Sequence, residues 1–398
     1  WTTRMEEIFP SGEFLLPNWS YFDSLEKVDI REPGQEEPVK VIPVPKTLKT
    51  PRIIAMEPTC MQYMQQAILY ELLEALKEDY FLSAMLGFDD QTPNQRMAHE
   101  GSRAGTLATL DLSEASDRVS NQLVINLTKN HPHLHGAIQA TRSYRADVPG
   151  HGIVPLAKFA SMGSALTFPI EAMVFLAIVI DSIGRQRGEP VTRTLLQELY
   201  GRVRIYGDDI IVPVEYVHSV IAGLEAYGLK VNTNKSFWNG KFRESCGKEY
   251  YDGYDVSIVK VRRVFPESRT HVPEVISLVS LRNQLYFAGY WRTVKWLDEL
   301  IGKMIHHFPV VEPTSSVLGR HTFLRGYETH KMHADLHSPM VKGFRVVPSI
   351  PTDKLDGEGA LLKFFLKRGG LPSVDEKHLE RAGRSQSVSI KLGWASPF

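Results

Sequence analysis

The stretch "RVRIYGDDIIVPV", residues 202–214, places two adjacent aspartates between two runs of strand-forming residues. The apolar residues on either side predict two short strands, and Gly207 can adopt the positive φ that a tight hairpin turn needs. Aspartate is common in turns, so Asp208 and Asp209 alone are compatible with a purely structural turn. Two touching carboxylates at the tip of a buried hairpin also suggest that a positive charge binds there.

A third aspartate, Asp111, ends the apolar run of "LATLDLSEASD" (107–117). Aspartates at the ends of neighbouring strands can converge on one point, where their like charges repel unless a counter-charge is present. Mg²⁺ fits this need, because it prefers oxygen ligands and is usually held by one or two carboxylates plus substrate phosphates. Two such ions about 4 Å apart can hold the attacking and leaving oxygens of an in-line phosphoryl displacement.

The composition is that of a globular protein: 398 residues, 43% hydrophobic and 23% charged, are enough for two or three domains. Lys plus Arg equals Asp plus Glu at 46 each, so a nucleic-acid partner would have to bind local basic patches. With only two cysteines, Cys60 and Cys246, a disulfide framework is excluded, which fits a reducing cytoplasm.

The sequence does not predict a membrane protein. Its longest apolar run, "AMVFLAIVI" (172–180), is too short to span a bilayer, and no signal-peptide pattern opens the chain. The first residue is Trp1 rather than Met, so we expect a fragment or a processed product.

The order of predicted elements indicates an α+β fold. Apolar spacing predicts helices over 59–80, 120–130, 169–183 and 215–228, with residues 131–158 rich in loops and the chain after about 270 mainly helical. Between them lie the strand before Asp111 and the hairpin. A small antiparallel sheet backed by helices is therefore expected.

Six blocks of the sequence follow one another in a characteristic order. They are "VPKTLKTPRIIAMEP" (44–58), "QRMAHEGSRAGTLATLDLSEASDRVS" (95–120), "KFASMGSALTFPIEAMVF" (158–175), "IYGDDIIVP" (205–213), "YGLKVNTNKSF" (227–237) and "FRESCGKEYYDGYDV" (242–256). In this order they resemble the basic finger motif and motifs A, B, C, D and E of the replicase catalytic (beta) subunits of positive-strand RNA bacteriophages, the levivirus group. A lone GDD is weak evidence, whereas six ordered blocks are specific.

The resemblance implies a right-hand polymerase with palm, fingers and helical thumb. Its expected domains are partial fingers, truncated at the N-terminus (1–104), palm with motif A (105–130), a fingers insertion (131–157), palm with motifs B to E (158–260), and a thumb with a C-terminal helical region (261–398).

The resemblance also assigns the catalytic roles. Asp111, Asp208 and Asp209 would be catalytic metal ligands, joined by the backbone carbonyl of Leu112, and would hold two Mg²⁺ ions with Mn²⁺ as an alternative. Lys235 would lie near the pyrophosphate as a general acid, the alternative being an ordinary surface lysine.

Further residues are implied to contact NTP or RNA, each with a structural alternative. The basic cluster Lys46, Lys49 and Arg52 would neutralise the triphosphate or belong to a solvated loop. Ser116 and Asp117, which follow motif A, would approach the ribose or cap a helix. Ser161, Gly163 and Thr167 of motif B would touch the nucleotide or belong to an ordinary loop. Relatives often carry Asn where this chain has Ser164, so the residue that contacts the 2′-hydroxyl stays open. The implied contacts are Lys46, Lys49, Arg52, Ser116, Asp117, Ser161, Gly163, Thr167 and Arg243.

The function implied is template-directed RNA synthesis that replicates a phage genome in the cytoplasm of the bacterial host. Its expected partners are RNA template and product, NTPs and, by family resemblance, host elongation factors Tu and Ts and an OB-fold ribosomal protein. One alternative is a reverse transcriptase, which usually carries an apolar residue in place of Gly207. Another is a non-catalytic RNA-binding subunit, against which the three intact aspartates argue.

Overall fold

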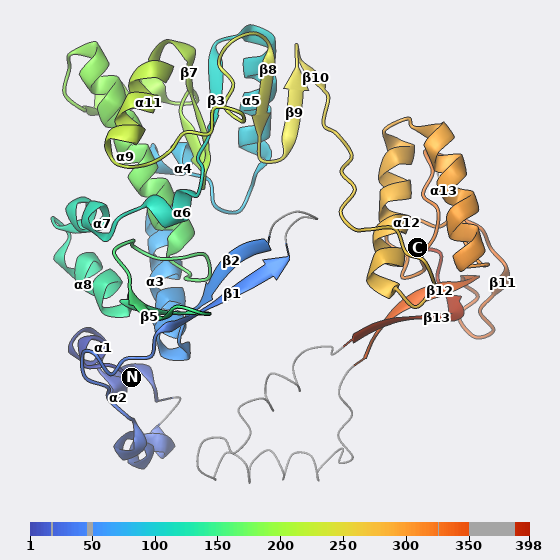
Figure 1. Cartoon of the computed structure of the whole chain (residues 1–398), viewed down its shortest axis with the longest axis horizontal. Coiled ribbons are helices and arrows are strands. Elements are labelled where there is room, and N and C mark those ends of the chain that lie inside the picture. The colour runs from blue at the N-terminus through green and yellow to red at the C-terminus, as the bar shows by residue number, and fades with distance from the viewer. Residues whose placement is uncertain (17–18, 46–50, 325, 350–386) are drawn as a thin grey trace. The chain divides into compact units, whose positions relative to one another are not determined.

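The computed structural model describes residues 1–16, 19–45, 51–324, 326–349 and 387–398 (Figure 1). The chain forms two compact units that divide between Ile258 and Val259, the first holding the described residues before this point and the second those after it. The predicted NTP contacts Lys46 and Lys49 lie outside the described residues.

The first unit is built mainly of helices around short sheets. Its helices are α1 (Thr3–Ile8), α2 (Ser11–Phe14), the 3-10 helix η1 (Trp19–Lys27), α3 (Thr59–Glu78), α4 (Leu82–Met85), α5 (Thr92–Ala104), α6 (Ala115–Arg118), α7 (Asn121–Thr128), α8 (Pro132–Thr141), α9 (Thr167–Arg187), α10 (Arg193–Leu199), η2 (Val214–Tyr216) and α11 (Val217–Ala226). Its strands are β1 (Val39–Pro45), β2 (Pro51–Met56), β3 (Leu107–Asp111), β4 (Arg145–Val148), β5 (Gly152–Pro155), β6 (Arg204–Tyr206), β7 (Asp209–Pro213), β8 (Phe242–Ser245), β9 (Lys248–Tyr251) and β10 (Tyr254–Asp255).

The central sheet has the order β3-β7-β6, and both of its pairings are antiparallel. Its β-branched residues favour extended backbone and are buried on both faces: Ile205, Ile210, Ile211 and Val212 are all fully buried. Helices α9 and α11 pack beside it, and their apolar side chains join those of the sheet in the largest core cluster of the unit.

Helix α9 is the core helix of this unit. Within the described ranges it is the one helix long and apolar enough to cross a membrane, but 78% of its apolar stretch is buried inside the protein. A helix that is apolar on all sides is expected when protein surrounds it.

A second sheet, of order β2-β1-β4-β5, lies against the loop that precedes α9. The backbone N–H of Ala55 in β2 donates to the carbonyl of Met162 at 2.8 Å, which joins the sheet to this loop. The third sheet, β10-β9-β8, contacts β3 and α5.

The second unit packs helices on a long hairpin. Helices α12 (Val272–Phe287) and α13 (Trp291–Met304) lie antiparallel, and strands β12 (Pro339–Ser349) and β13 (Ser387–Ala395) pair from Val341–Ala395 to Ser349–Ser387, with β11 (Lys331–Met332) at the edge. Leu278, Leu297, Ile301 and Phe344 form part of the core between helices and hairpin.

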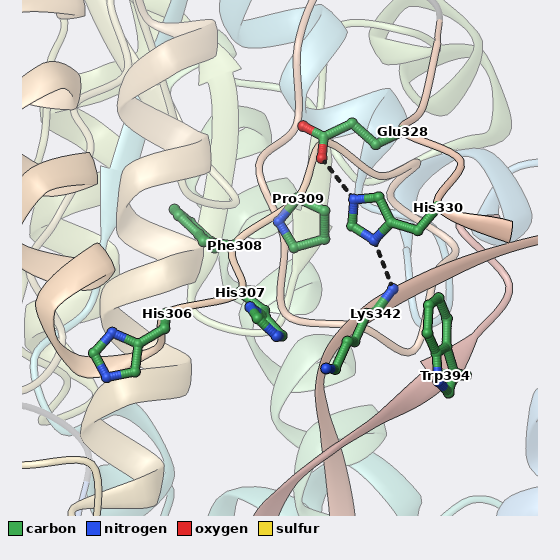
Figure 2. Close-up of a pocket in the computed structure, with 8 residues that line it drawn as sticks. All are labelled: His306, His307, Phe308, Pro309, Glu328, His330, Lys342 and Trp394. Atoms are coloured by element: carbon green, nitrogen blue, oxygen red, sulfur yellow. Dashed lines mark hydrogen bonds and ion pairs between the residues drawn. The ribbon is translucent and has the colours of Figure 1, made fainter.

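A cavity of about 400 Å³ in the second unit gathers His306, His307 and His330 with Glu328, Lys342 and Trp394 (Figure 2). His330 lies between two partners: its Nε2 is 3.4 Å from the Glu328 carboxylate, and its Nδ1 accepts the backbone N–H of Lys342 at 3.0 Å. Both ring nitrogens of His330 are thus engaged within the protein.

The α+β class predicted from the sequence is confirmed, since helices and antiparallel sheets share one core. Two local expectations were wrong. Residues 131–158 contain helix α8 as well as loops, and the region after 270 contains strands β11, β12 and β13 besides its helices. The division into fingers, palm and thumb stays a prediction.

Candidate active site

The central sheet brings two of the predicted aspartates face to face. Asp111, the last residue of β3, is the register partner of Asp209, the first residue of β7, and Tyr206 of β6 pairs with Asp209 on its other side. Directly opposed residues in an antiparallel pair project from the same face of the sheet. The turn Gly207–Asp208 joins β6 to β7 at this end, so all three aspartates lie at one end of the sheet.

The segment 229–238 holds Asp111 from the edge of β3 opposite to β7. Isolated bridges join Thr109 to Phe237 and Leu112 to Val231. From this segment the Asn232 side-chain N–H donates to Asp111 Oδ2 at 2.9 Å, and Lys235 Nζ lies 3.6 Å from Oδ1. Lys235 therefore lies beside Asp111, and its role as a general acid near the pyrophosphate stays a prediction.

Burial raises the pKa of Asp111, and the charge of Asp208 adds to this effect. Lys235 and Asn232 oppose the rise, because a cation and a hydrogen-bond donor both favour the carboxylate. The backbone of Asp111 is fixed as well: its N–H donates to Ser236 Oγ at 3.0 Å, and its carbonyl accepts the Asn232 N–H at 2.8 Å. Sequence reasoning missed Asn232 and Ser236, although both lie in the quoted motif D block.

Asp209 is half-buried beside the β8–β9 turn, where Ser245 Oγ donates to its Oδ1 at 3.3 Å. Burial raises the pKa of Asp209 to about 7; the Cys246 backbone N–H opposes the rise, and the charges of Asp208, Glu244 and Asp111 add to it. Asp208 itself is exposed at the tip of the hairpin. This end of the sheet thus concentrates negative charge that a cation would relieve.

The hairpin turn is packed directly on the start of α9. Gly207 has φ 59°, and a Cβ at this position would lie 2.4 Å from Cε2 of Phe168. Only glycine fits here, because the backbone is left-handed and the ring occupies the space of a side chain.

One helical turn beyond Phe168 lies Glu171, a buried carboxylic acid that sequence reasoning missed. It is 8% exposed, and among the described residues its Oε2 has no hydrogen-bond partner. Burial first, and then the charges of Asp208 and Asp117, raise the pKa of Glu171 to about 8. Its occurrence in an otherwise apolar helix sequence was the available signal.

The loop before α9 is hydrogen-bonded both to that helix and to strand β2. The buried Thr167 hydroxyl donates to the carbonyl of Ser161 at 2.7 Å, which closes the loop on the first helical turn. Gly163 has φ 127°, and a Cβ there would lie 1.9 Å from the Ala55 carbonyl oxygen. Of the three predicted contacts in this loop, Gly163 is exposed, whereas Ser161 and Thr167 are buried.

The residues after β3 divide between surface and interior. Asp117 is exposed and accepts a hydrogen bond from Lys158 Nζ at 2.6 Å. Ser116 is 5% exposed, and within the described ranges its hydroxyl has no hydrogen-bond partner. Ser120, rather than Ser116 or Asp117, caps the helix that follows: its side chain accepts a hydrogen bond from the Leu123 N–H at the start of α7.

Arg243 requires a correction, because it is fully buried rather than available to a ligand. Its guanidinium donates to backbone carbonyls, with distances of 2.5 Å to Leu107, 3.1 Å to Gly240, 2.6 Å to Phe242 and 3.3 Å to Trp238. These bonds tie β8 to the start of β3. Arg243 therefore supports the sheet, and in this structure its guanidinium is bonded to backbone carbonyls rather than exposed to a ligand. Arg52, by contrast, is exposed on β2.

The three aspartates are suitable ligands for a divalent metal, but their side chains do not form a complete metal-binding site in this structure. Asp111, Asp208 and Asp209 offer hard oxygen atoms at one acidic end of the sheet, and such oxygen atoms are the ligands that Mg²⁺ prefers. The Leu112–Val231 bridge uses the Asp111 carbonyl and the Ser113 N–H, so it leaves the Leu112 carbonyl for another partner. Nevertheless, in the part of the chain that is described, no three His, Cys, Asp or Glu side chains already stand in positions to hold a metal.

Comparison with known proteins places the chain among phage replicases. It is 37% identical over 223 residues to the RNA-directed RNA polymerase beta chain of Escherichia phage MS2, which covers 56% of this chain and 37% of that protein. It is 34% identical over 332 residues to the RNA-directed RNA polymerase subunit beta of Escherichia virus Qbeta, covering 82% of this chain and 51% of that protein. The chain thus spans about half the length, or less, of these relatives.

A weaker likeness exists to the solved RNA-dependent RNA polymerase of a human picobirnavirus, with an insertion loop deleted. It has a TM-score of 0.46 and 11% identity, and covers 67% of this chain and 57% of that one. The family model described as "RNA replicase, beta-chain" matches residues 28–299. The protein is a member of the RNA replicase beta-chain family.

Proposed function

We propose that this chain carries the nucleotidyl-transfer site of an RNA-directed RNA polymerase that replicates a positive-strand phage RNA. In this reaction the 3′-hydroxyl of the growing RNA attacks the α-phosphate of an NTP, and pyrophosphate leaves. The observation that carries the proposal is the pairing of Asp111 with Asp209 beside Asp208, in a chain of the replicase family.

Membership of this family leads us to expect a divalent metal in general, and we propose two Mg²⁺ ions. When bound, they would supply the charge that activates the attacking hydroxyl and stabilises the leaving pyrophosphate. Asp111, Asp208 and Asp209 would hold them, with the Leu112 carbonyl as a further oxygen ligand. Burial raises the pKa of Asp209 to about 7, and the charges of Asp208, Glu244 and Asp111 add to the rise, so a bound cation would stabilise the ionised carboxylate.

Two neighbouring side chains would prepare the site. Asn232 holds one oxygen of Asp111, which restricts the orientation of that carboxylate. Lys235 is 61% exposed and reaches the other oxygen at 3.6 Å, so its ammonium can move between the carboxylate and a nearby phosphate. We propose that Lys235 donates the proton that neutralises the leaving pyrophosphate.

The partners follow from the proposed reaction and from the family. RNA template, RNA product and NTPs are the partners that the chemistry requires. Host elongation factors Tu and Ts, an OB-fold ribosomal protein and the cytoplasm of the bacterial host are proposed from family resemblance alone. Affinity capture of the purified chain with each purified host protein would test these partners one at a time.

The deciding experiment is RNA synthesis by the purified chain on a defined template, with NTPs or dNTPs, in the presence and absence of host lysate. We expect NTP incorporation that Asp208→Asn reduces at least a hundredfold. Asp181→Asn is the matched control, because Asp181 lies on α9 in an exposed ion pair with Arg185. Undiminished synthesis by Asp208→Asn would support the non-catalytic alternative, and preference for dNTPs would support a reverse transcriptase.

A further inference from the structure

Strands β11, β12 and β13 of the second unit carry an excess of positive charge. Their residues include Lys331, Lys342, Arg345 and Lys391 and no aspartate or glutamate, whereas Lys plus Arg equals Asp plus Glu over the whole chain. Arg345 and Lys391 are register partners, and directly opposed like charges destabilise a sheet. In the described part of the chain, none of these four cations forms an ion pair. A local concentration of cations indicates an anionic partner.

The cavity of about 400 Å³ lies at the Lys342–Trp394 end of this sheet (Figure 2). Lys342 and Trp394 both line it, and as register partners they project from the same face of the sheet. Lys331 Nζ lies 4.2 Å from the centre of the Trp394 ring, so a second ammonium group lies beside the cavity. His306 and His307 also line it, and within the described ranges neither side chain forms a hydrogen bond or an ion pair. Each imidazole therefore has an N–H available for a ligand.

Among the described residues that line the cavity, Glu328 is the only acid, and its charge is already met by protein groups. Its Oε1 accepts hydrogen bonds from Arg320 Nη2 at 3.0 Å and from the Val310 N–H at 3.1 Å. Its Oε2 lies 3.4 Å from Nε2 of His330, which carries the ring hydrogen because Nδ1 accepts the Lys342 backbone N–H. The ammonium group of Lys342 therefore keeps no counter-charge in the cavity.

Three histidines in one cavity could instead indicate a metal site. In the part of the chain that the structure describes, however, no three His, Cys, Asp or Glu side chains are placed to hold a metal ion. The ammonium group of Lys342 would also repel a cation. The ligand class that fits is an anion that accepts hydrogen bonds, and a phosphate group has both properties.

The site extends beyond what a single phosphate needs. Lys342 and Arg345 are three residues apart on β12, about 10 Å at the usual rise of a strand, so the cations continue along the hairpin. Trp394 is 37% exposed. Cations that follow a nucleic-acid backbone, combined with an exposed aromatic ring on which a base can stack, are typical of single-strand binding sites. A free phosphate would leave the ring unused, and a duplex keeps its bases stacked on one another.

We propose that this cavity, with Lys331, Lys342 and Trp394, binds a nucleotide unit of single-stranded RNA, in addition to the RNA bound at the site of nucleotidyl transfer. Lys342 and the imidazoles of His306 and His307 hold a phosphate, and a base stacks on the face of Trp394 that Lys331 leaves open. The inference rests on the proposed polymerase function, because that function makes RNA the polyanion that this chain meets. It adds an RNA contact in the second unit, whereas the three aspartates belong to the first.

The test is photo-cross-linking of the full chain to a short single-stranded RNA that contains thiouridine, followed by mass spectrometry of the cross-linked peptides. We expect a cross-linked peptide that contains Trp394 or His306–Phe308. Lys342→Met should lower the yield of this cross-link about tenfold or more, because a charge-assisted hydrogen bond is lost. It should also reduce the slope of log affinity against log salt concentration by about 0.7, the contribution of one phosphate contact to a single strand.

Trp394→Leu removes the stacking surface and should lower the yield by roughly fivefold to a hundredfold. Trp394→Phe keeps an aromatic face and should restore most of the yield. Lys295→Met is the matched control, because Lys295 is an exposed lysine of α13 that does not line the cavity, and it should leave the yield unchanged.

Competition separates the sources of phosphate. Unlabelled single-stranded RNA should abolish the cross-link, whereas inorganic phosphate, duplex RNA or phosphatidylserine vesicles at the same phosphate concentration should not. The inference is overturned if cross-links occur only elsewhere in the chain, if either Lys342→Met or Trp394→Leu keeps the original yield, or if another competitor is as effective as single-stranded RNA. No Mg²⁺ or NTP is added, so a chain that synthesises RNA but lacks this cross-link overturns the inference alone and leaves the polymerase proposal intact.

Discussion

Asp111 and Asp209 are opposed residues of the antiparallel β3–β7 pair, so two carboxylates about a hundred positions apart in the chain project from one face of a sheet. The hairpin turn adds Asp208 at the same end. Charge, burial and hydrogen bonding at this site lead to several measurable consequences.

Stability of the metal-free chain should fall as the pH rises. The pKa of Asp209 is raised to about 7, so the folded state binds this proton more tightly than the unfolded state does. The stabilisation is fully present below the unfolded pKa near 4 and is lost as the pH passes through about 7. We expect Tm to decrease by roughly a few degrees between pH 5 and pH 8.

Asp209→Asn should flatten that decrease, and Mg²⁺ should restore stability more at pH 8 than at pH 5. The flattening is partial, because Glu171 has a pKa raised to about 8 and acts in the same direction. Differential scanning calorimetry across this pH range provides the measurement. A Tm that rises with pH in the absence of metal would contradict the description of the cluster.

Asn232 should matter for catalysis through the orientation of Asp111. Asn232→Ala removes the 2.9 Å hydrogen bond to Oδ2 and leaves the carboxylate free to rotate. We expect about a tenfold loss in the rate of nucleotide incorporation and a higher Mg²⁺ concentration at half-maximal rate. Asn234→Ala, at an exposed position of the same turn, is the matched control. Equal effects of the two variants would argue against an orienting role.

Gly163 should be irreplaceable for two separable reasons. Its φ of 127° strains any side chain, and a Cβ would lie 1.9 Å from the Ala55 carbonyl. Gly163→Ala should lower the free energy of unfolding by about 3 kcal/mol or more. Gly188, with φ 70° and open space, provides the control, and Gly188→Ala should cost about 1–2 kcal/mol. Urea denaturation measures the free energy of unfolding of both variants. Similar losses in Gly163→Ala and Gly188→Ala would show that movement of the loop relieves the clash.

Arg243 should affect stability rather than RNA binding. Arg243→Met leaves several buried carbonyls without a donor, and we expect a loss of about 3 kcal/mol in the free energy of unfolding. The salt dependence of RNA binding by the folded variant should stay unchanged, because no phosphate contact is removed. Arg185→Met, at a 71% exposed position, is the control for stability. If Arg243→Met instead kept normal stability and showed a weaker salt dependence of RNA binding, the prediction that Arg243 contacts RNA would be supported.

The sequence predicted the parts of this site that depend on local pattern. Alternating strand formers ending in aspartate predicted β3 and the hairpin β6–β7, and glycine at position 207 predicted its turn. The order of six blocks predicted the family that the comparisons then identified. The strands β12 and β13 were missed, although "VKGFRVV" alternates in the manner of a strand.

The remaining features depend on contacts that no local pattern encodes. Asn232 reaches Asp111 because the segment 229–238 pairs along the free edge of β3. Arg243 looked like a surface cation, since arginine is almost never fully buried, and only the convergence of several carbonyls explains its burial. Glu171 was hidden within an apolar helix, where its position relative to Asp208 becomes evident only in three dimensions.

The most direct test of the central claim is the position of Mn²⁺ ions in crystals of the chain soaked with Mn²⁺ and NTP, located by anomalous scattering. We predict two peaks within coordination distance of Asp111, Asp208 and Asp209, and their loss in Asp208→Asn. Peaks elsewhere only, or peaks that persist unchanged in Asp208→Asn, would contradict the assignment of these three carboxylates as the site of nucleotidyl transfer.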